Sequence, residues 1–216
     1  RLDKTVGTQS ISLSPDDGMG YDETDDKTLD AGDWDSSIAQ VSITDRQVWL
    51  CNRIIERVNK KHPGIKYGML AYGASTRPPV REKPHAQLVP QIAPITFRRA
   101  HPMTDDRVPD NKELRALIEG WAKLSPELSY YYYGWFLAEP SAPNPFLTKW
   151  AVDVPIAMSN NCAYWQPETL ANFETTMHAL YMSLRLAWDP AEDPWAVYDE
   201  INTRFYGRAA PQMKAY

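Results

Sequence analysis

Five short β-prone runs, separated by loops and helical patterns, constrain the fold of this chain most. They lie near residues 10, 67, 91, 132 and 163 of the 216. Between them, apolar residues at helical spacing predict helices over 44–62, from Asp110, and over about 146–158. An order of strand, loop, helix and strand is typical of a parallel sheet with crossover helices. We therefore expect an α/β fold whose ligand site lies beyond the carboxyl ends of the strands.

Capping residues predict where several helices begin. Thr44 and Gln47 have the spacing of a capping box and predict the start of the first helix. Pro167 predicts the start of a long amphipathic helix, because proline favours the first helical position. Asp193, which is followed by proline, predicts the start of a last helix. We expect residues 168–216 to be C-terminal helices that pack on the strands before them.

The composition excludes several classes of protein. The net charge of −5 argues against a nucleic-acid surface, which normally carries a basic patch. The two cysteines lack C-x-x-C spacing, so neither a disulfide framework nor a structural zinc site is expected. No apolar run approaches the roughly 18 to 20 residues that cross a bilayer. We therefore expect no nucleic-acid partner, no membrane span and no metal.

The motifs of several enzyme classes are missing from the sequence. There is no G-x-S-x-G elbow, no glycine-rich phosphate loop and no H-E-x-x-H motif. Serine hydrolases, nucleotide enzymes and zinc proteases are excluded, and no cofactor is expected. The 8 tryptophans and 12 tyrosines suit flat amphipathic ligands such as sugars, although any single aromatic residue is more often part of a core.

The loop after the first strand carries nine acidic residues between Asp16 and Asp35. Such runs are often solvated loops, and a calcium loop fits poorly because Lys27 stands where glycine is needed. Asp22 and Glu23 differ from the rest because they are adjacent and lie just past a strand end. Repulsion between neighbouring carboxylates raises one pKa and creates a proton donor near neutral pH. Glycoside hydrolysis uses a carboxylate pair, or one acid with a group on the substrate.

The other strand ends supply candidate substrate-binding residues. Two of them, Arg98 and His101, lie in the segment Arg98-Arg99-Ala-His101, which suits an acidic sugar as well as it suits a structural role. Glu139 is a candidate second carboxylate, although a loop residue bound to backbone is the more common case. The candidates together are Asp17, Tyr72, Arg98, His101, Tyr133, Trp135 and Gln166.

Seven segments resemble, in order along the chain, the domain of unknown function family 4838. The first of them is the most specific, and together they cover nearly the whole chain. They are Ile11-Ser-Leu-Ser-Pro-Asp-Asp-Gly18, Gly20-Tyr-Asp-Glu23, Gly68-Met-Leu-Ala-Tyr72, Ala100-His-Pro102, Pro143-Asn-Pro145, Leu186-Ala-Trp-Asp-Pro190 and Phe205-Tyr-Gly207.

The resemblance implies a fold, an activity and two catalytic residues. The family is similar to (β/α)₈ barrel glycosidases such as α-glucuronidases, and it includes glycoside hydrolase family 163, endo-β-N-acetylglucosaminidases that act on N-glycans. By resemblance the 2-acetamido oxygen of the substrate attacks the anomeric carbon, Glu23 is the general acid and Asp22 steadies the acetamido nitrogen. Many members have Cys-Glu-Cys where this chain has Asp22-Glu23-Thr24, so Glu23 is the closer match. The resemblance also implies a secreted or periplasmic protein.

We expect a glycosidase that acts on N-acetylglucosamine-containing glycans by a substrate-assisted retaining mechanism. Five strands are fewer than the eight of a complete barrel, so the chain is expected to hold about strands four to eight of a TIM barrel. The partial barrel would span 1–167, with helices over 168–216 and an N-terminal part of the protein as partner. The alternatives are a non-catalytic glycan-binding module and a two-carboxylate, α-glucuronidase-like enzyme. The sequence leaves open whether the sugar is acidic or neutral.

Overall fold

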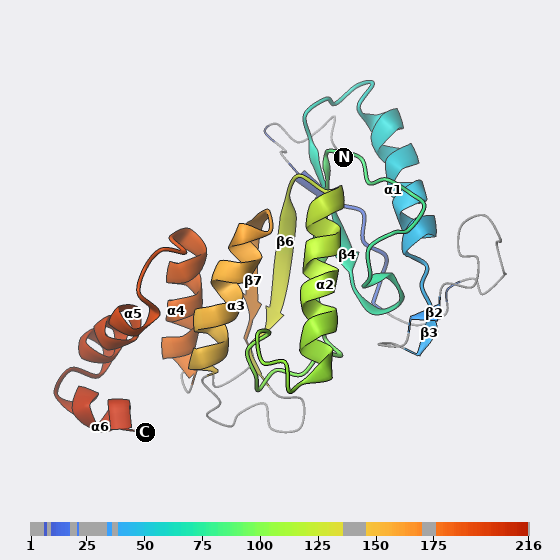
Figure 1. The fold of residues 1–216 in the computed structure, drawn as a ribbon. Helices are drawn as coiled ribbons and strands as arrows, with labels where there is room; N and C mark the ends of the chain where they lie inside the picture. Colours follow the sequence, from blue (N-terminus) through green and yellow to red (C-terminus); the bar gives the residue numbers. More distant parts are fainter. Residues whose placement is uncertain are drawn as a thin grey trace. The chain divides into compact units, whose positions relative to one another are not determined.

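The computed structural model describes residues 7, 10–17, 21, 34–35, 39–135, 146–169 and 176–215. Within these residues, five strands form one sheet in the same order as they follow along the chain. Figure 1 colours the chain by residue number and labels most of its helices and strands. The pairs β1/β4 and β4/β5 are parallel, so the fold is mixed α/β as predicted. The sheet consists of β1 (Ser10–Ser12), β4 (Lys66–Ala71), β5 (Leu88–Ile92), β6 (Leu128–Tyr133) and β7 (Cys162–Glu168).

The helices predicted over 44–62, from Asp110 and over about 146–158 are confirmed, and the first of them ends four residues early, at Val58. The chain divides into two compact units. The first unit comprises residues 1–96 and 116–129, and the second comprises 97–115 and 130–216. In the described residues the helices are too short or too polar to span a bilayer. The α-helices are α1 (Thr44–Val58), α2 (Pro109–Leu124), α3 (Leu147–Ser159), α4 (Met177–Trp188), α5 (Pro194–Ile201) and α6 (Ala210–Ala215).

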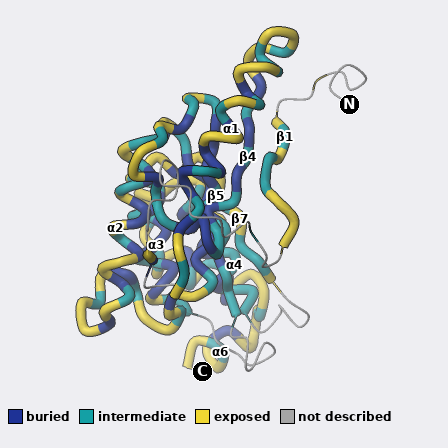
Figure 2. The backbone as a smooth tube through the Cα atoms, turned by 90° about the vertical axis from the view of Figure 1, so that its right-hand side faces the viewer, coloured by how far each residue is buried: buried dark blue, intermediate teal, exposed yellow. Residues whose placement is uncertain are grey.

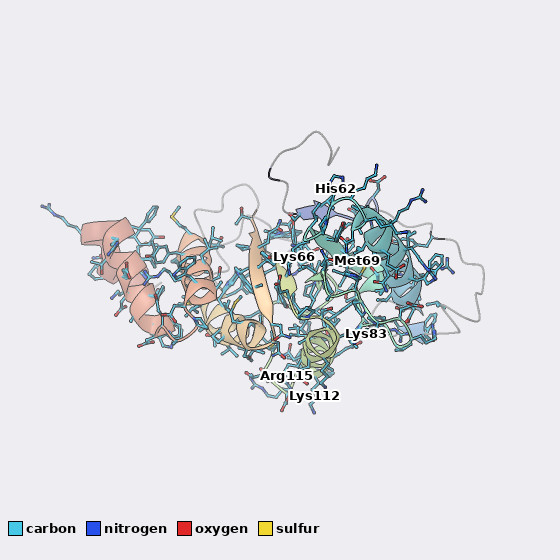
Figure 3. The ribbon with its side chains drawn as sticks, turned by 90° about the horizontal axis from the view of Figure 1, so that it is seen from above. His62, Lys66, Met69, Lys83, Lys112 and Arg115 are labelled. Atoms are coloured by element: carbon cyan, nitrogen blue, oxygen red, sulfur yellow. The ribbon has the colours of Figure 1, made fainter. Side chains whose placement is uncertain are left out.

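In the first unit, β4 buries every second side chain. Tyr67 and Met69 have no exposed surface, while Lys66 on the other face is half-buried and pairs with Glu127 at 2.8 Å. Figure 2 shows β4 and β5 largely buried and β1 less so, and Figure 3 labels Lys66 and Met69. This alternation is the period of a strand that packs against helices on one face.

Helix α1 begins at Thr44 as predicted, but its first turn is not capped in the predicted way. The helix begins at Thr44, and the residue before it, Ile43, makes no side-chain capping bond, so the predicted capping box of Thr44 and Gln47 is wrong. The Thr44 hydroxyl instead donates to the carbonyl of Arg77 at 2.8 Å. The Thr44 hydroxyl, which the local pattern predicts to cap the helix, is therefore used in a tertiary hydrogen bond.

A small hairpin lies in the stretch predicted to be a long loop. Strands β2 (Trp34–Asp35) and β3 (Gln40–Val41) pair antiparallel, with Trp34 opposite Val41. The Arg77 guanidinium donates to the Trp34 carbonyl at 3.2 Å. The two-residue strands are too short for period-2 alternation to reveal them.

In the second unit, β7 runs through the residue predicted to open a helix. Pro167 lies inside β7, so the predicted helix start there is wrong, and α4 begins at Met177. Because β7 is the last strand in the sheet order, it tolerates a residue without a backbone N–H group. The predicted cap at Asp193 is confirmed: its carboxylate accepts the Trp195 N–H at 2.9 Å.

The α4 and α5 helices of the second unit are joined by one arginine. The Arg185 guanidinium donates to Glu192 at 2.8 Å, to Glu200 at 3.0 Å and to the Tyr181 hydroxyl at 2.8 Å. The chain continues through a π-helical turn, Asn202–Tyr206, and a 3-10 turn, Gly207–Ala209. Gly207 has a φ of +53°, which glycine adopts without strain, and it lies where the π-helical turn ends and the 3-10 turn begins.

Candidate functional site

Four consecutive tyrosines on β6 point alternately to two faces of the strand. Tyr130 and Tyr132 are buried, with 2% and 3% of their surface exposed, and we call their side the core face. Tyr131 and Tyr133 are half-buried on the opposite side, which we call the open face. Successive side chains of a strand point to opposite faces, so this division follows from the backbone alone.

The core face of β6 is an aromatic cluster. Tyr132 packs on Trp150 of α3 with ring centroids 4.0 Å apart, and Tyr130 stacks on Trp165 of β7 at 5.2 Å. Burial raises the pKa of both hydroxyls well above the ordinary value, which keeps them protonated. These groups hold the unit together and have no route to a solvent-borne ligand.

The open face carries a second cluster, made of Arg99, Tyr131, Tyr133, Trp135 and Glu168, which we call the open-face cluster. The Arg99 guanidinium carbon lies 5.1 Å from the ring centroid of Tyr133 and 5.3 Å from that of Trp135. One Arg99 N–H donates to the Trp135 carbonyl at 3.2 Å. A guanidinium at this distance from two aromatic rings is held by cation–π attraction and by its hydrogen bond.

The carboxylate of the open-face cluster comes from the end of β7. Glu168 accepts a hydrogen bond from the Trp135 indole N–H at 3.0 Å. Burial raises the pKa of the Tyr131 hydroxyl, and the charge and hydrogen bond of Glu168 raise it further. Burial lowers the pKa of Arg99, while Tyr133, Tyr132 and Glu168 oppose that shift. The cluster therefore places the Arg99 guanidinium and the Glu168 carboxylate among three aromatic side chains. All of these groups lie near the carboxyl ends of β6 and β7.

A buried ion pair anchors the segment that carries Arg99. Lys149 and Asp153, one turn apart on α3, lie 2.5 Å from each other and expose 4% and 1% of their side chains. Lys149 donates to the His101 carbonyl at 2.9 Å, and Asp153 accepts the Met103 N–H at 2.8 Å. Burial raises the pKa of Asp153, and Lys149 opposes that shift. The pair thus fixes the backbone two residues beyond Arg99.

A family model for a domain of unknown function, DUF4838, matches residues 1–216. The chain belongs to this family. No curated protein and no solved structure matches it. The DUF4838 assignment agrees with the resemblance seen in the sequence motifs, and it carries no activity with it.

The open-face cluster of this DUF4838 chain contains two of the predicted substrate-binding residues, Tyr133 and Trp135. Arg98 lies apart from Arg99, is exposed, and faces Asp110 at 3.5 Å. His101 is half-exposed and faces Asp105 at 3.2 Å, and the pKa of that carboxyl is held well below its usual range, chiefly by Arg107.

Of the remaining predicted residues, Gln166 lies on β7 two residues before Glu168, whereas Asp17 and Tyr72 belong to the first unit. Gln166 is exposed on β7, Asp17 is exposed after β1, and Tyr72 is half-buried after β4. Asp22, Glu23 and Glu139 lie outside the described residues. Among the described residues, no group of three or more His, Cys, Asp and Glu side chains is placed to hold a metal ion.

Sequence reasoning missed Glu168 and Tyr131. The predicted helix start at Pro167 places Glu168 in a helix, whereas the structure has it at the end of β7. The sequence did contain a signal for a strand: Tyr164, Gln166 and Glu168 are polar or amphipathic residues at period 2, and Trp165 between them faces the core. Tyr131 has the same parity as Tyr133, so the strand period alone places both on one face.

Proposed function

We propose that this chain is the sugar-binding and catalytic part of a glycoside hydrolase that acts on N-acetylglucosamine-containing glycans. The observation that carries the proposal is the open-face cluster at the carboxyl ends of β6 and β7. Ligands of parallel α/β sheets bind at these ends. Two half-buried aromatic rings, Tyr133 and Trp135, offer flat apolar surfaces for a sugar ring, and Arg99 and Glu168 offer a donor and an acceptor for its polar groups.

The strand order supports a portion of a (β/α)₈ barrel. Within the five-stranded sheet, each of β4, β5, β6 and β7 neighbours the sheet strand that precedes it along the chain, and the hairpin strands β2 and β3 lie outside this sheet. A doubly wound sheet reverses its order at a switch point, whereas the strands of a barrel follow one another around the wall. We propose that the five strands correspond to about strands four to eight of a TIM barrel.

The chemistry we propose is substrate-assisted and retaining. Glu23 protonates the leaving sugar, the acetamido oxygen of the substrate attacks the anomeric carbon, and Asp22 orients the acetamido nitrogen. The open-face cluster contributes binding: it desolvates and orients one sugar unit while Glu23 transfers its proton. Orientation of this kind supplies a large share of catalysis because the reacting groups meet without further ordering.

The test is cleavage of an aryl β-N-acetylglucosaminide and of N-glycans, measured as release of the aryl alcohol and of the product oligosaccharide. We expect Glu23→Gln to abolish release while leaving sugar binding intact, because the amide keeps the shape of the side chain and cannot donate the proton. Trp135→Ala should weaken sugar binding about fivefold, since a stacked aromatic ring is worth about 1 kcal/mol. Glu113→Gln, an acid on α2, is the matched control and should retain activity. Full activity of the Glu23→Gln variant would refute the catalytic part of the proposal.

A second candidate function is glycan binding without turnover. It is favoured by the nature of the described cluster, because Tyr133, Trp135, Arg99 and Glu168 supply binding groups. The two candidates separate in one experiment: sugar binding that depends on Trp135, with no product released from any glycan tested, would establish the binding module and exclude the hydrolase.

A further inference from the structure

Arg98 and Arg99 are adjacent in the sequence, and an arginine at the site would favour an acidic sugar. In the structure they separate. Arg98 is 67% exposed and faces Asp110 at 3.5 Å, outside the open-face cluster. Arg99 is half-buried within it and is the arginine that a bound sugar would meet. The charge preference of the site therefore depends on what surrounds Arg99.

The surroundings of Arg99 hold its guanidinium in place and commit one of its N–H donors. Its guanidinium lies near the rings of Tyr133 and Trp135, and one N–H donates to the Trp135 carbonyl at 3.2 Å. An arginine that reads a carboxylate does so with two parallel N–H groups of its planar fork. One N–H of the fork is already committed to a backbone carbonyl, so a bidentate contact that used this N–H would have to displace that hydrogen bond.

Glu168 places a negative charge in the same cluster. Trp135 links the two charged groups: its carbonyl accepts from Arg99, and its indole N–H donates to Glu168 at 3.0 Å. The Glu168 charge is close enough to act on both Arg99 and the Tyr131 hydroxyl. A ligand carboxylate in this cluster would meet repulsion from Glu168 along with attraction to Arg99, whereas sugar hydroxyls and amide N–H groups would find an acceptor.

We propose that Glu168 is a specificity-determining residue: it balances the charge of Arg99 and makes the open-face cluster select uncharged sugar units over uronic or sialic acid units. The inference rests on the proposed function, because it needs a sugar at this site. Discrimination of this kind uses a repulsive element against the wrong ligand as well as contacts to the right one. Glu168 fills both roles, as hydroxyl acceptor and as a barrier to anions.

The experiment compares two matched ligands, methyl β-N-acetylglucosaminide and its analogue with a carboxylate at C6, by calorimetric titration. The wild-type protein should bind the neutral sugar at least about tenfold more tightly. Glu168→Gln preserves the shape and removes the charge, so the acidic analogue should gain about tenfold relative to the neutral sugar. Arg99→Gln leaves Glu168 unbalanced and should widen the gap in favour of the neutral sugar.

The control is Asp110→Asn, which removes the carboxylate facing Arg98 and should leave the ligand preference unchanged. Circular dichroism and a thermal melt establish that each variant is folded, and Arg99→Gln keeps the test decisive if Glu168→Gln is unstable. Equal or tighter wild-type binding of the acidic analogue, or an unchanged preference in Glu168→Gln, overturns this inference and leaves the proposed function standing. If neither ligand binds to the wild-type protein, the proposed function fails and this inference fails with it.

Discussion

The two faces of β6 carry the same side chain in two environments. Tyr130 and Tyr132 on the core face pack against Trp150 and Trp165 of the same unit, with ring centroids 4.0 to 5.4 Å apart, and Lys149 lies 5.9 Å from the ring centroid of Tyr132. Tyr131 and Tyr133 on the open face lie beside a guanidinium and a carboxylate. Residue type is identical, so the difference in role comes from strand parity and from what the neighbouring elements bring to each face.

This comparison explains why one short run can serve both stability and binding. Aromatic rings bury large apolar areas, and on the core face that area stabilises the unit. On the open face the same rings keep part of their surface accessible and hold Arg99 in place. Substitutions on the two faces should therefore affect different measurements, stability on one and ligand binding on the other.

The largest expected difference is in stability. Tyr132→Ala should lower the free energy of unfolding by about 3 to 5 kcal/mol, because it opens a cavity against Trp150. Tyr133→Ala should cost less than half as much, since its ring is half-buried, and should instead reduce sugar binding. Urea unfolding followed by circular dichroism measures both variants. Equal losses of stability for Tyr132→Ala and Tyr133→Ala would show that the two faces of β6 contribute equally to stability, contrary to this prediction.

The second prediction tests whether the buried ion pair of Lys149 and Asp153 is needed for sugar binding at the open-face cluster. Lys149→Met should cost about 3 kcal/mol, because it leaves the buried carboxylate of Asp153 unpaired. It should also weaken sugar binding by releasing the His101 carbonyl, and with it the segment that carries Arg99. The double variant Lys149→Met with Asp153→Leu should recover most of the stability but not the binding. Recovery of both would show that the pair acts only on stability.

Much of the fold could be predicted from the sequence because its signals are local. The helical period of Val48, Cys51 and Ile55 places α1, and the apolar runs place β4 and β5. The predictions that are wrong involve tertiary competition. The Thr44 hydroxyl has a partner 33 residues away, and Pro167 is accommodated by an edge position in the sheet order. Neither circumstance is visible in the residues alone.

The candidate site was predictable only in part, for the same reason. Tyr133 and Trp135 follow from a β-prone run at a strand end, which is a local pattern. Glu168 joins them through a hydrogen bond to Trp135 across 33 residues of chain. Arg98 and Arg99 are adjacent, yet their side chains have different neighbours: Arg98 faces Asp110 and Arg99 lies beside Tyr133. The spacing of residues in the sequence does not determine which of the two joins the cluster. Roles that depend on which elements meet require the structure.

The reactivity of the buried Cys162 thiol reports how tightly the core face of β6 is packed. Burial raises the pKa of Cys162, at the start of β7, to about 11, and it raises that of Cys51 on α1 to the same value. At pH 8 about one thiol in a thousand is ionised, so both should react slowly with iodoacetamide in the folded protein. Tyr132→Ala loosens the core face and should speed labelling of Cys162 about tenfold, with Cys51 as the internal control. Equal acceleration at both cysteines, read by mass spectrometry, would indicate global rather than local opening.

The smallest expected effect concerns single hydroxyl groups and isolates polarity from ring packing. The Tyr132 hydroxyl has no hydrogen-bond partner within the described part of the chain, so Tyr132→Phe should leave stability unchanged or raise it slightly. Tyr131→Phe removes the hydroxyl bound to Glu168 and should cost about 0.5 to 1.5 kcal/mol. Because each change deletes one oxygen and keeps the ring, the contrast in thermal melts reports polar contacts alone. A larger loss of stability for Tyr132→Phe than for Tyr131→Phe would mean that the Tyr132 hydroxyl has a hydrogen-bond partner. The two faces would then differ in burial and not in the polar contacts of their hydroxyl groups.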